Sequence, residues 1–83
     1  MTDDDGDEIA LIASLILRYL ARHPDAADSI EGVQKWWLAS QGYNFPKPQV
    51  EQALDRLIGE GRVTRRDAAS QAIYRRAVDG RPA

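Results

Sequence analysis

Apolar residues in the first quarter of the chain recur with the spacing of one helix face, at i, i+3, i+4, i+7 and i+11. These positions are Ile9, Ile12, Ala13, Ile16 and Leu20. The stripe is typical of an amphipathic helix, which we expect from about Glu8 to Arg22, because Pro24 disfavours the helical conformation of the residue before it. Leu11, Leu15 and Tyr19 widen the stripe, so we expect this helix to contact protein on more than one side, in a monomer or in a homodimer.

A second helix is predicted from the capping pattern Asp-Ser-Ile-Glu at residues 28–31. In such a pattern the Asp28 carboxylate accepts from an amide of the first turn, and Glu31 reaches back to the cap. The apolar positions of this helix are Ile30, Val33 and Trp37. We expect it to continue to about Ser40, with Gly42 as its stop and residues 25–27 as a short connection before it.

The third helix has the most regular pattern of the chain and follows a turn that carries two aromatic residues. Its apolar positions are Val50, Ala53, Leu54, Leu57 and Ile58. Pro48 suits the first helical position, and Gly59 and Gly61 end the helix. Residues 62–66 and 72–78 then have the length and the β-branched or aromatic residues of strands. The predicted organisation is an acidic disordered tail (1–8), one domain (9–78) and a frayed C-terminus (79–83).

The pattern Pro48-x-Val50-x-x-Ala53-Leu54-x-x-Leu57-x-x-x-Gly61-x-Val63 resembles the third helix and first wing strand of winged helix-turn-helix proteins. The resemblance implies a mainly α fold with a small β wing, in which three helices precede a two-stranded antiparallel hairpin. Residues 28–77 would form the helix-turn-helix and the wing. The stretch from Asp28-Ser29-Ile30-Glu31-Gly32 to Trp36-Trp37-Leu38 is also similar to a group of small uncharacterised bacterial winged-helix proteins, which adds to the fold and implies no activity.

Charge is distributed unevenly over the 83 residues, whose formal net charge is −2. Residues 1–61 carry five basic and eleven acidic side chains, a net of −6, whereas residues 62–83 carry six arginines and two aspartates, a net of +4. Such asymmetry indicates either a basic contact surface or only the need of strands and a tail for soluble side chains.

The composition argues against catalytic and metal chemistry. There is no cysteine, and the single histidine, His23, stands beside a proline, as a helix-end residue does. The acidic start at residues 3–8 lacks the spacing of a calcium loop. We therefore expect no enzyme, no metal and no cofactor. With no signal peptide and no apolar run long enough for a bilayer, we expect a cytoplasmic protein without a membrane partner, and the nine arginines against two lysines hint at a bacterial source.

In winged-helix DNA-binding proteins the third helix enters the major groove and the wing touches the backbone. Here Gln49 and Gln52 can read adenine, while Lys47 and Arg56 can contact phosphate or guanine. The wing arginines that would contact phosphate or an acidic partner are Arg65, Arg66, Arg75 and Arg76. Three acidic residues on the same helix oppose DNA binding; they are Glu51, Asp55 and Glu60. The alternatives are an ordinary solvated helix face and wing charges that protect a sheet edge.

Two adjacent tryptophans on the second helix point about 100° apart. Trp37 continues the apolar stripe and is expected in the core. Trp36 is either packed there too or partly exposed, beside Leu38 or beside Tyr43 and Phe45, where it would anchor a protein interface. Our first hypothesis is a non-enzymatic winged-helix interaction module with an unknown protein partner, which contacts it through these aromatic residues or the arginine wing. A DNA-binding transcriptional regulator is the alternative.

Overall fold

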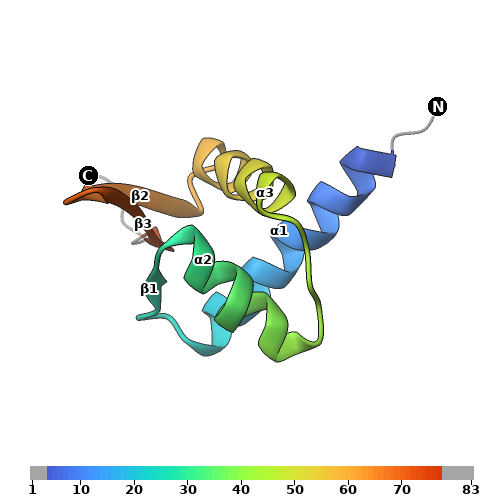
Figure 1. Cartoon of the computed structure of the whole chain (residues 1–83), viewed down its shortest axis with the longest axis horizontal. Coiled ribbons are helices and arrows are strands. Elements are labelled where there is room, and N and C mark those ends of the chain that lie inside the picture. The colour runs from blue at the N-terminus through green and yellow to red at the C-terminus, as the bar shows by residue number, and fades with distance from the viewer. Residues whose placement is uncertain (1–3, 78–83) are drawn as a thin grey trace.

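The apolar stripes of the first and third helices meet in one core, to which a small sheet contributes at one side (Figure 1). The computed structural model describes residues 4–77. Its elements are α1 (Asp4–Arg22), β1 (Ala27–Asp28), α2 (Ile30–Gly32), η1 (Val33–Leu38), η2 (Ala39–Gln41), α3 (Lys47–Gly59), β2 (Val63–Ala68) and β3 (Gln71–Arg76). The predicted class, mainly helical with a winged-helix type of sheet, is confirmed.

The core follows the predicted helix faces closely. All five stripe positions of α1 are buried, as are four of the five on α3, where Ile58 is half-buried. Val33, Trp37 and Leu38 fill the space between these helices, and Val63 and Tyr74 close the core from the sheet. No helix within residues 4–77 is long and apolar enough to cross a membrane.

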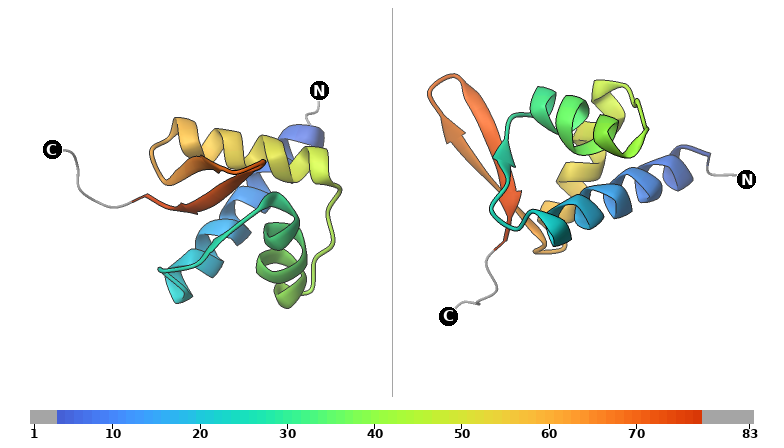
Figure 2. Two further views of the ribbon diagram at one scale, coloured as in Figure 1. Left: turned by 60° about the vertical axis from the view of Figure 1, so that its left-hand side comes forward. Right: turned by 90° about the horizontal axis from the view of Figure 1, so that it is seen from below.

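The sheet has three strands in the order β1-β3-β2, not the two that the sequence predicted. The added strand, β1, pairs Ala27 with Arg75 and Asp28 with Tyr74 in an antiparallel ladder. A strand of two residues shows no alternation of apolar and polar positions, so its pattern could not be distinguished from a connection. Figure 2 shows the β2–β3 hairpin extending away from the helices, with β1 at its side.

The N-cap of the second helical segment lies one residue later than predicted. Ser29 is the N-cap: its Oγ accepts from the Gly32 amide at 3.3 Å, while Asp28 Oδ1 accepts from the amide of Ser29 at 3.1 Å. The capping role assigned to Asp28 therefore belongs to Ser29, since Asp28 already lies in β1. The segment changes from α to π to 3₁₀ winding and ends, as predicted, at Gly42, whose φ of 89° suits glycine.

Other boundaries differ from the sequence prediction by a few residues. Helix α1 begins at Asp4, not near Glu8, and so includes part of the predicted tail. Helix α3 begins at Lys47, which makes Pro48 its second residue. The wing strands are 63–68 and 71–76, where 62–66 and 72–78 were expected. The predicted frayed C-terminus and the first three residues of the tail lie outside the described residues.

Candidate functional site

The two adjacent tryptophans have opposite environments. Trp37 is 1% exposed, and its ring stacks on Tyr19 of α1 at a centroid distance of 5.4 Å. Trp36 is 62% exposed. Because Val33 and Leu38 share the inward direction with Trp37, the residue before Trp37 is turned outward. Of the two interpretations that the sequence left open, the structure has the exposed Trp36.

The other predicted aromatic residues form a separate pair in the segment before α3. The rings of Tyr43 and Phe45 stack at 5.7 Å with an interplanar angle of 5°. Gln34 Nε2 donates to the Phe45 carbonyl at 3.0 Å and fixes this segment against η1. Phe45 is half-buried, whereas Tyr43 is 39% exposed. Within the described part of the chain, Trp36 stacks on neither ring, so the three residues do not form a single aromatic cluster.

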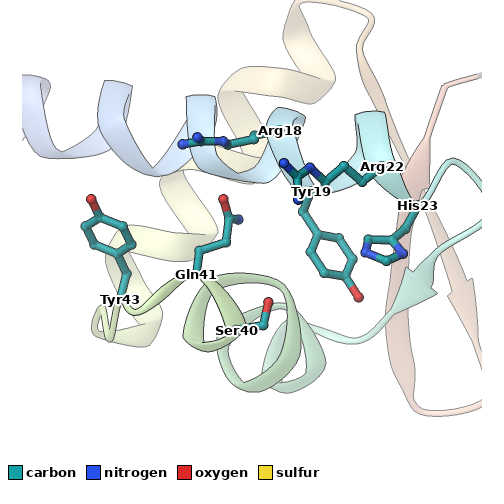
Figure 3. A pocket seen from close by; sticks show the side chains of 7 residues that line it. All are labelled: Arg18, Tyr19, Arg22, His23, Ser40, Gln41 and Tyr43. Carbon is teal, nitrogen blue, oxygen red and sulfur yellow. The ribbon is translucent and has the colours of Figure 1, made fainter.

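A groove of about 360 Å³ separates the last turns of α1 from η2. We call it the basic-aromatic groove. It is lined by Arg18, Tyr19, Arg22, His23, Ser40, Gln41 and Tyr43. Figure 3 shows Tyr43 and His23 at opposite ends, with the two arginines along α1 between them. The sequence does not reveal this groove, because its residues come from α1, from η2 and from the positions that follow each of them, whose packing no local pattern indicates.

The walls of the basic-aromatic groove are held from within the protein. Gln41 Nε2 donates to the carbonyls of Leu15 and Trp37, both at 2.9 Å, and so connects η2 to α1. The His23 ring lies 4.3 Å from the ring of Tyr19, tilted by 32°. Together with the stacking of Tyr19 on Trp37, this makes a column of three aromatic rings that runs from the core to the groove.

The electrostatics of this groove are one-sided. Among the residues whose side chains the structure describes, no acidic one lines the groove. Neither Arg18 nor Arg22 forms an ion pair with any residue between 7 and 77. The two guanidinium groups are one helical turn apart on exposed positions of α1, so the groove presents positive charge in a chain that is acidic overall.

Helix α3 shows the opposite arrangement. Lys47 Nζ lies 3.1 Å from Glu31, and Arg56 lies 3.4 Å from Glu60, which also approaches Arg62 at 3.9 Å. The hydrogen bond from Lys47 is the main cause that lowers the pKa of Glu31 below its ordinary value of 4.5. Both basic residues proposed to contact DNA from this helix are therefore already paired.

The remaining polar surface of α3 is acidic or neutral. Glu51, Asp55 and Gln52 are exposed, and Gln49 is half-buried. Burial raises the pKa of Tyr74, a rise that the charges of Asp55 and Glu51 reinforce and that of Arg65 opposes. Glu51 and Asp55 thus lie close enough to Tyr74 of β3 for their negative charges to act on it.

The arginines of the wing divide between its two faces. Strand register places Arg66 opposite Ile73 and Arg75 opposite Thr64, so these two arginines share one face, while Arg65 lies opposite the buried Tyr74 on the other. Arg65 pairs with Asp67 at 3.2 Å. Arg66, Arg75 and Arg76 form no ion pair within the described range.

No group of three His, Asp or Glu side chains in the described part of the chain is placed to hold a metal ion. Comparisons with protein-family profiles, with curated proteins and with solved structures find no match for this chain. The surfaces described above are consequently the observations from which a function can be inferred.

Proposed function

We propose that this chain is a non-enzymatic winged-helix module that binds another protein, with Trp36 as the anchor of the contact. The observation that carries the proposal is the 62% exposure of Trp36 beside a fully buried neighbour. A tryptophan left in water offers a large apolar area whose burial strengthens an interface, and tryptophan is enriched among the residues that dominate binding energy. Membership of the winged-helix superfamily and a bacterial cytoplasmic setting belong to this proposal; the order of helices and strands supports the first.

The surroundings of Trp36 support an interface better than an isolated exposed ring would. Single exposed apolar residues are common on soluble proteins. Here Ser40, which lines the basic-aromatic groove, follows Trp36 by four residues, about one helical turn. Tyr43 lines the far end of the same groove and is itself 39% exposed. A partner on Trp36 therefore meets an adjoining polar and aromatic surface.

The test compares the tagged wild-type chain with Trp36→Ala in affinity purification from the source cells, with bound proteins quantified by mass spectrometry. We expect Trp36→Ala to lose specific partners while its thermal unfolding stays close to wild type. Ser14→Ala, at another exposed position, is the control and should keep them. An identical set of partners with all three chains would contradict the proposal.

DNA binding is a second candidate, which one observation favours: Arg66 and Arg75 share a wing face on which neither is paired with a described residue. Random duplex in a fluorescence anisotropy assay separates the two functions. Phosphate contacts make affinity fall steeply with salt. The interaction module predicts no such salt-dependent binding, and a steep salt dependence would favour the DNA-binding regulator.

Whether α1 pairs with a second copy of the chain stays a prediction. Leu11 is 40% exposed on this helix, which gives a second copy some apolar surface to cover. Sedimentation of the purified protein measures the outcome directly.

A further inference from the structure

We propose that the basic-aromatic groove binds an acidic peptide segment of the protein partner. The inference rests on the proposed function and adds to it the chemistry of what is bound. The occupant is identified by charge complementarity: the groove has two arginines and a histidine in its lining and no acidic residue. The nearest acidic residue along the chain, Asp25, is not part of the lining.

Arg18 and Arg22 supply the charge recognition. They extend over the groove from successive turns of α1 (Figure 3). A guanidinium group can hold a carboxylate through two parallel hydrogen bonds. Since neither arginine has an ion-pair partner between residues 7 and 77, a carboxylate of the partner does not have to displace an existing one.

The opposite wall offers a group that suits a peptide backbone. Both bonds from Gln41 Nε2 go to backbone carbonyls of this chain, which fixes the orientation of the amide. Its carbonyl oxygen is then left to accept from an N–H of the bound segment. Ser40 Oγ, next to it, donates to the Trp37 carbonyl at 3.4 Å.

The aromatic residues add contacts for apolar side chains of the same segment. Tyr19, His23 and Tyr43 have ring surface in the lining. Because Trp37 holds Tyr19 and Tyr19 holds His23 by stacking, that end of the groove is formed before anything binds, which reduces the ordering cost of association. A segment that leaves the groove past Ser40 reaches Trp36 one turn away.

The experiment selects binders from random 12-residue peptides displayed on phage, with the whole chain as target. We expect the selected peptides to be enriched in Asp and Glu around a leucine or an aromatic residue. Synthetic copies are then titrated by fluorescence anisotropy. Like charges that face each other across an interface repel, so the double variant Arg18→Glu/Arg22→Glu should weaken binding of acidic peptides by about ten-fold or more.

Two further variants control for net charge and for folding. Arg66→Glu/Arg75→Glu makes the same charge change on the wing and should keep the wild-type affinity. Arg18→Gln/Arg22→Gln should weaken binding with less perturbation of α1. Circular dichroism verifies that each variant is helical before its affinity is interpreted.

The outcomes distinguish this inference from the proposed function. Peptides that need Trp36 but bind Arg18→Glu/Arg22→Glu as well as wild type would overturn the groove and leave the interaction module in place. Peptides whose affinity is changed neither by Arg18→Glu/Arg22→Glu nor by Trp36→Ala would contradict both the groove and the interaction module. Selection without acidic enrichment, or selection of no binder, would also overturn the acidic segment as occupant.

Discussion

The arginines of α1 and those on or just after α3 differ in their ion pairing. Along α1, Arg18 and Arg22 face a groove without acidic residues, whereas on α3 and its following turn Arg56 and Arg62 are both close to Glu60. The residue types are the same, but an acidic neighbour within the chain decides whether a positive charge is available to a partner. Net charge by segment, positive only after residue 61, therefore misses Arg18 and Arg22, which lie in an acidic part of the sequence.

Helix α3 differs in charge from the third helix of a winged-helix DNA-binding protein. That helix enters the major groove while the wing touches the phosphate backbone, and binding so close to phosphate requires unpaired positive charge. Here the exposed Glu51 and Asp55 add negative charge, and Lys47 is held by Glu31. The basic residues of α3, on the surface that the fold commonly presents to DNA, are thus paired within the chain. Arg18 and Arg22, which are not, lie on α1 beside the aromatic residues of the groove.

The largest expected effect is the loss of stability when the buried Trp37, which supports the groove residue Tyr19, is removed. Trp37→Ala removes a buried ring that packs under Tyr19, so it should reduce the free energy of unfolding by about 3–5 kcal/mol. Trp36→Ala, one residue away, should cost only about 0.5 kcal/mol, as at other exposed positions. Urea denaturation of the two variants measures both values. Equal losses would show that Trp36 is also part of the core.

The next effect tests the neutralised surface directly. Glu51→Lys/Asp55→Lys changes the charge of α3 by four units, and we expect it to raise affinity for random duplex at low salt by about ten-fold, because each added phosphate contact releases counterions. Fluorescence anisotropy measures this gain. Asp7→Lys/Asp25→Lys makes the same charge change at exposed positions away from α3 and is the matched control; an equal gain there would reduce the effect to net charge alone.

Two glycines at helix ends, one after η2 and one in the last position of α3, should shift the stability in opposite directions. Gly42 follows η2 with φ of 89°, so an alanine there is strained although nothing lies within 4 Å; Gly42→Ala should destabilise by about 1 kcal/mol. Gly59 closes α3, also with open space around it, and Gly59→Ala should stabilise by about 0.5 kcal/mol. Thermal unfolding followed by circular dichroism compares them. A shift of the same sign for both would contradict the assigned backbone conformations.

The parts that the sequence predicted correctly share one cause. The stripes of α1 and α3 and the stop at Gly42 are set by neighbours within one or two helical turns, so their patterns are visible in the chain. The pairing of β1 with β3, the exposed direction of Trp36 and the basic-aromatic groove depend on how distant segments pack. The ion pairs that occupy Lys47 and Arg65 depend on the same packing and on rotamers. Which charged side chains are paired within the chain was therefore, like these long-range contacts, not determined by the sequence pattern.

The smallest effect concerns Glu31, whose carboxylate holds Lys47 at 3.1 Å. Its pKa is lowered in the folded chain, so the folded state favours the charged form, and the resulting stability is present above the ordinary value of 4.5. That stability is lost as the pH falls through the lower folded pKa. Glu31→Gln should thus lower the Tm slightly at pH 7 and leave it unchanged in strong acid.

The difference between the Tm of Glu31→Gln and that of wild type should also shrink in 1 M salt, because both side chains are half-exposed and exposed charges are screened within about 3 Å at that ionic strength. Calorimetry at several pH values and two salt concentrations measures it. A Tm difference that persists in acid would assign the role of Glu31 to packing. The same substitution releases Lys47 on α3. If pairing within the chain is what keeps this surface from binding nucleic acid, Glu31→Gln should also raise the affinity for duplex at low salt, by less than Glu51→Lys/Asp55→Lys does.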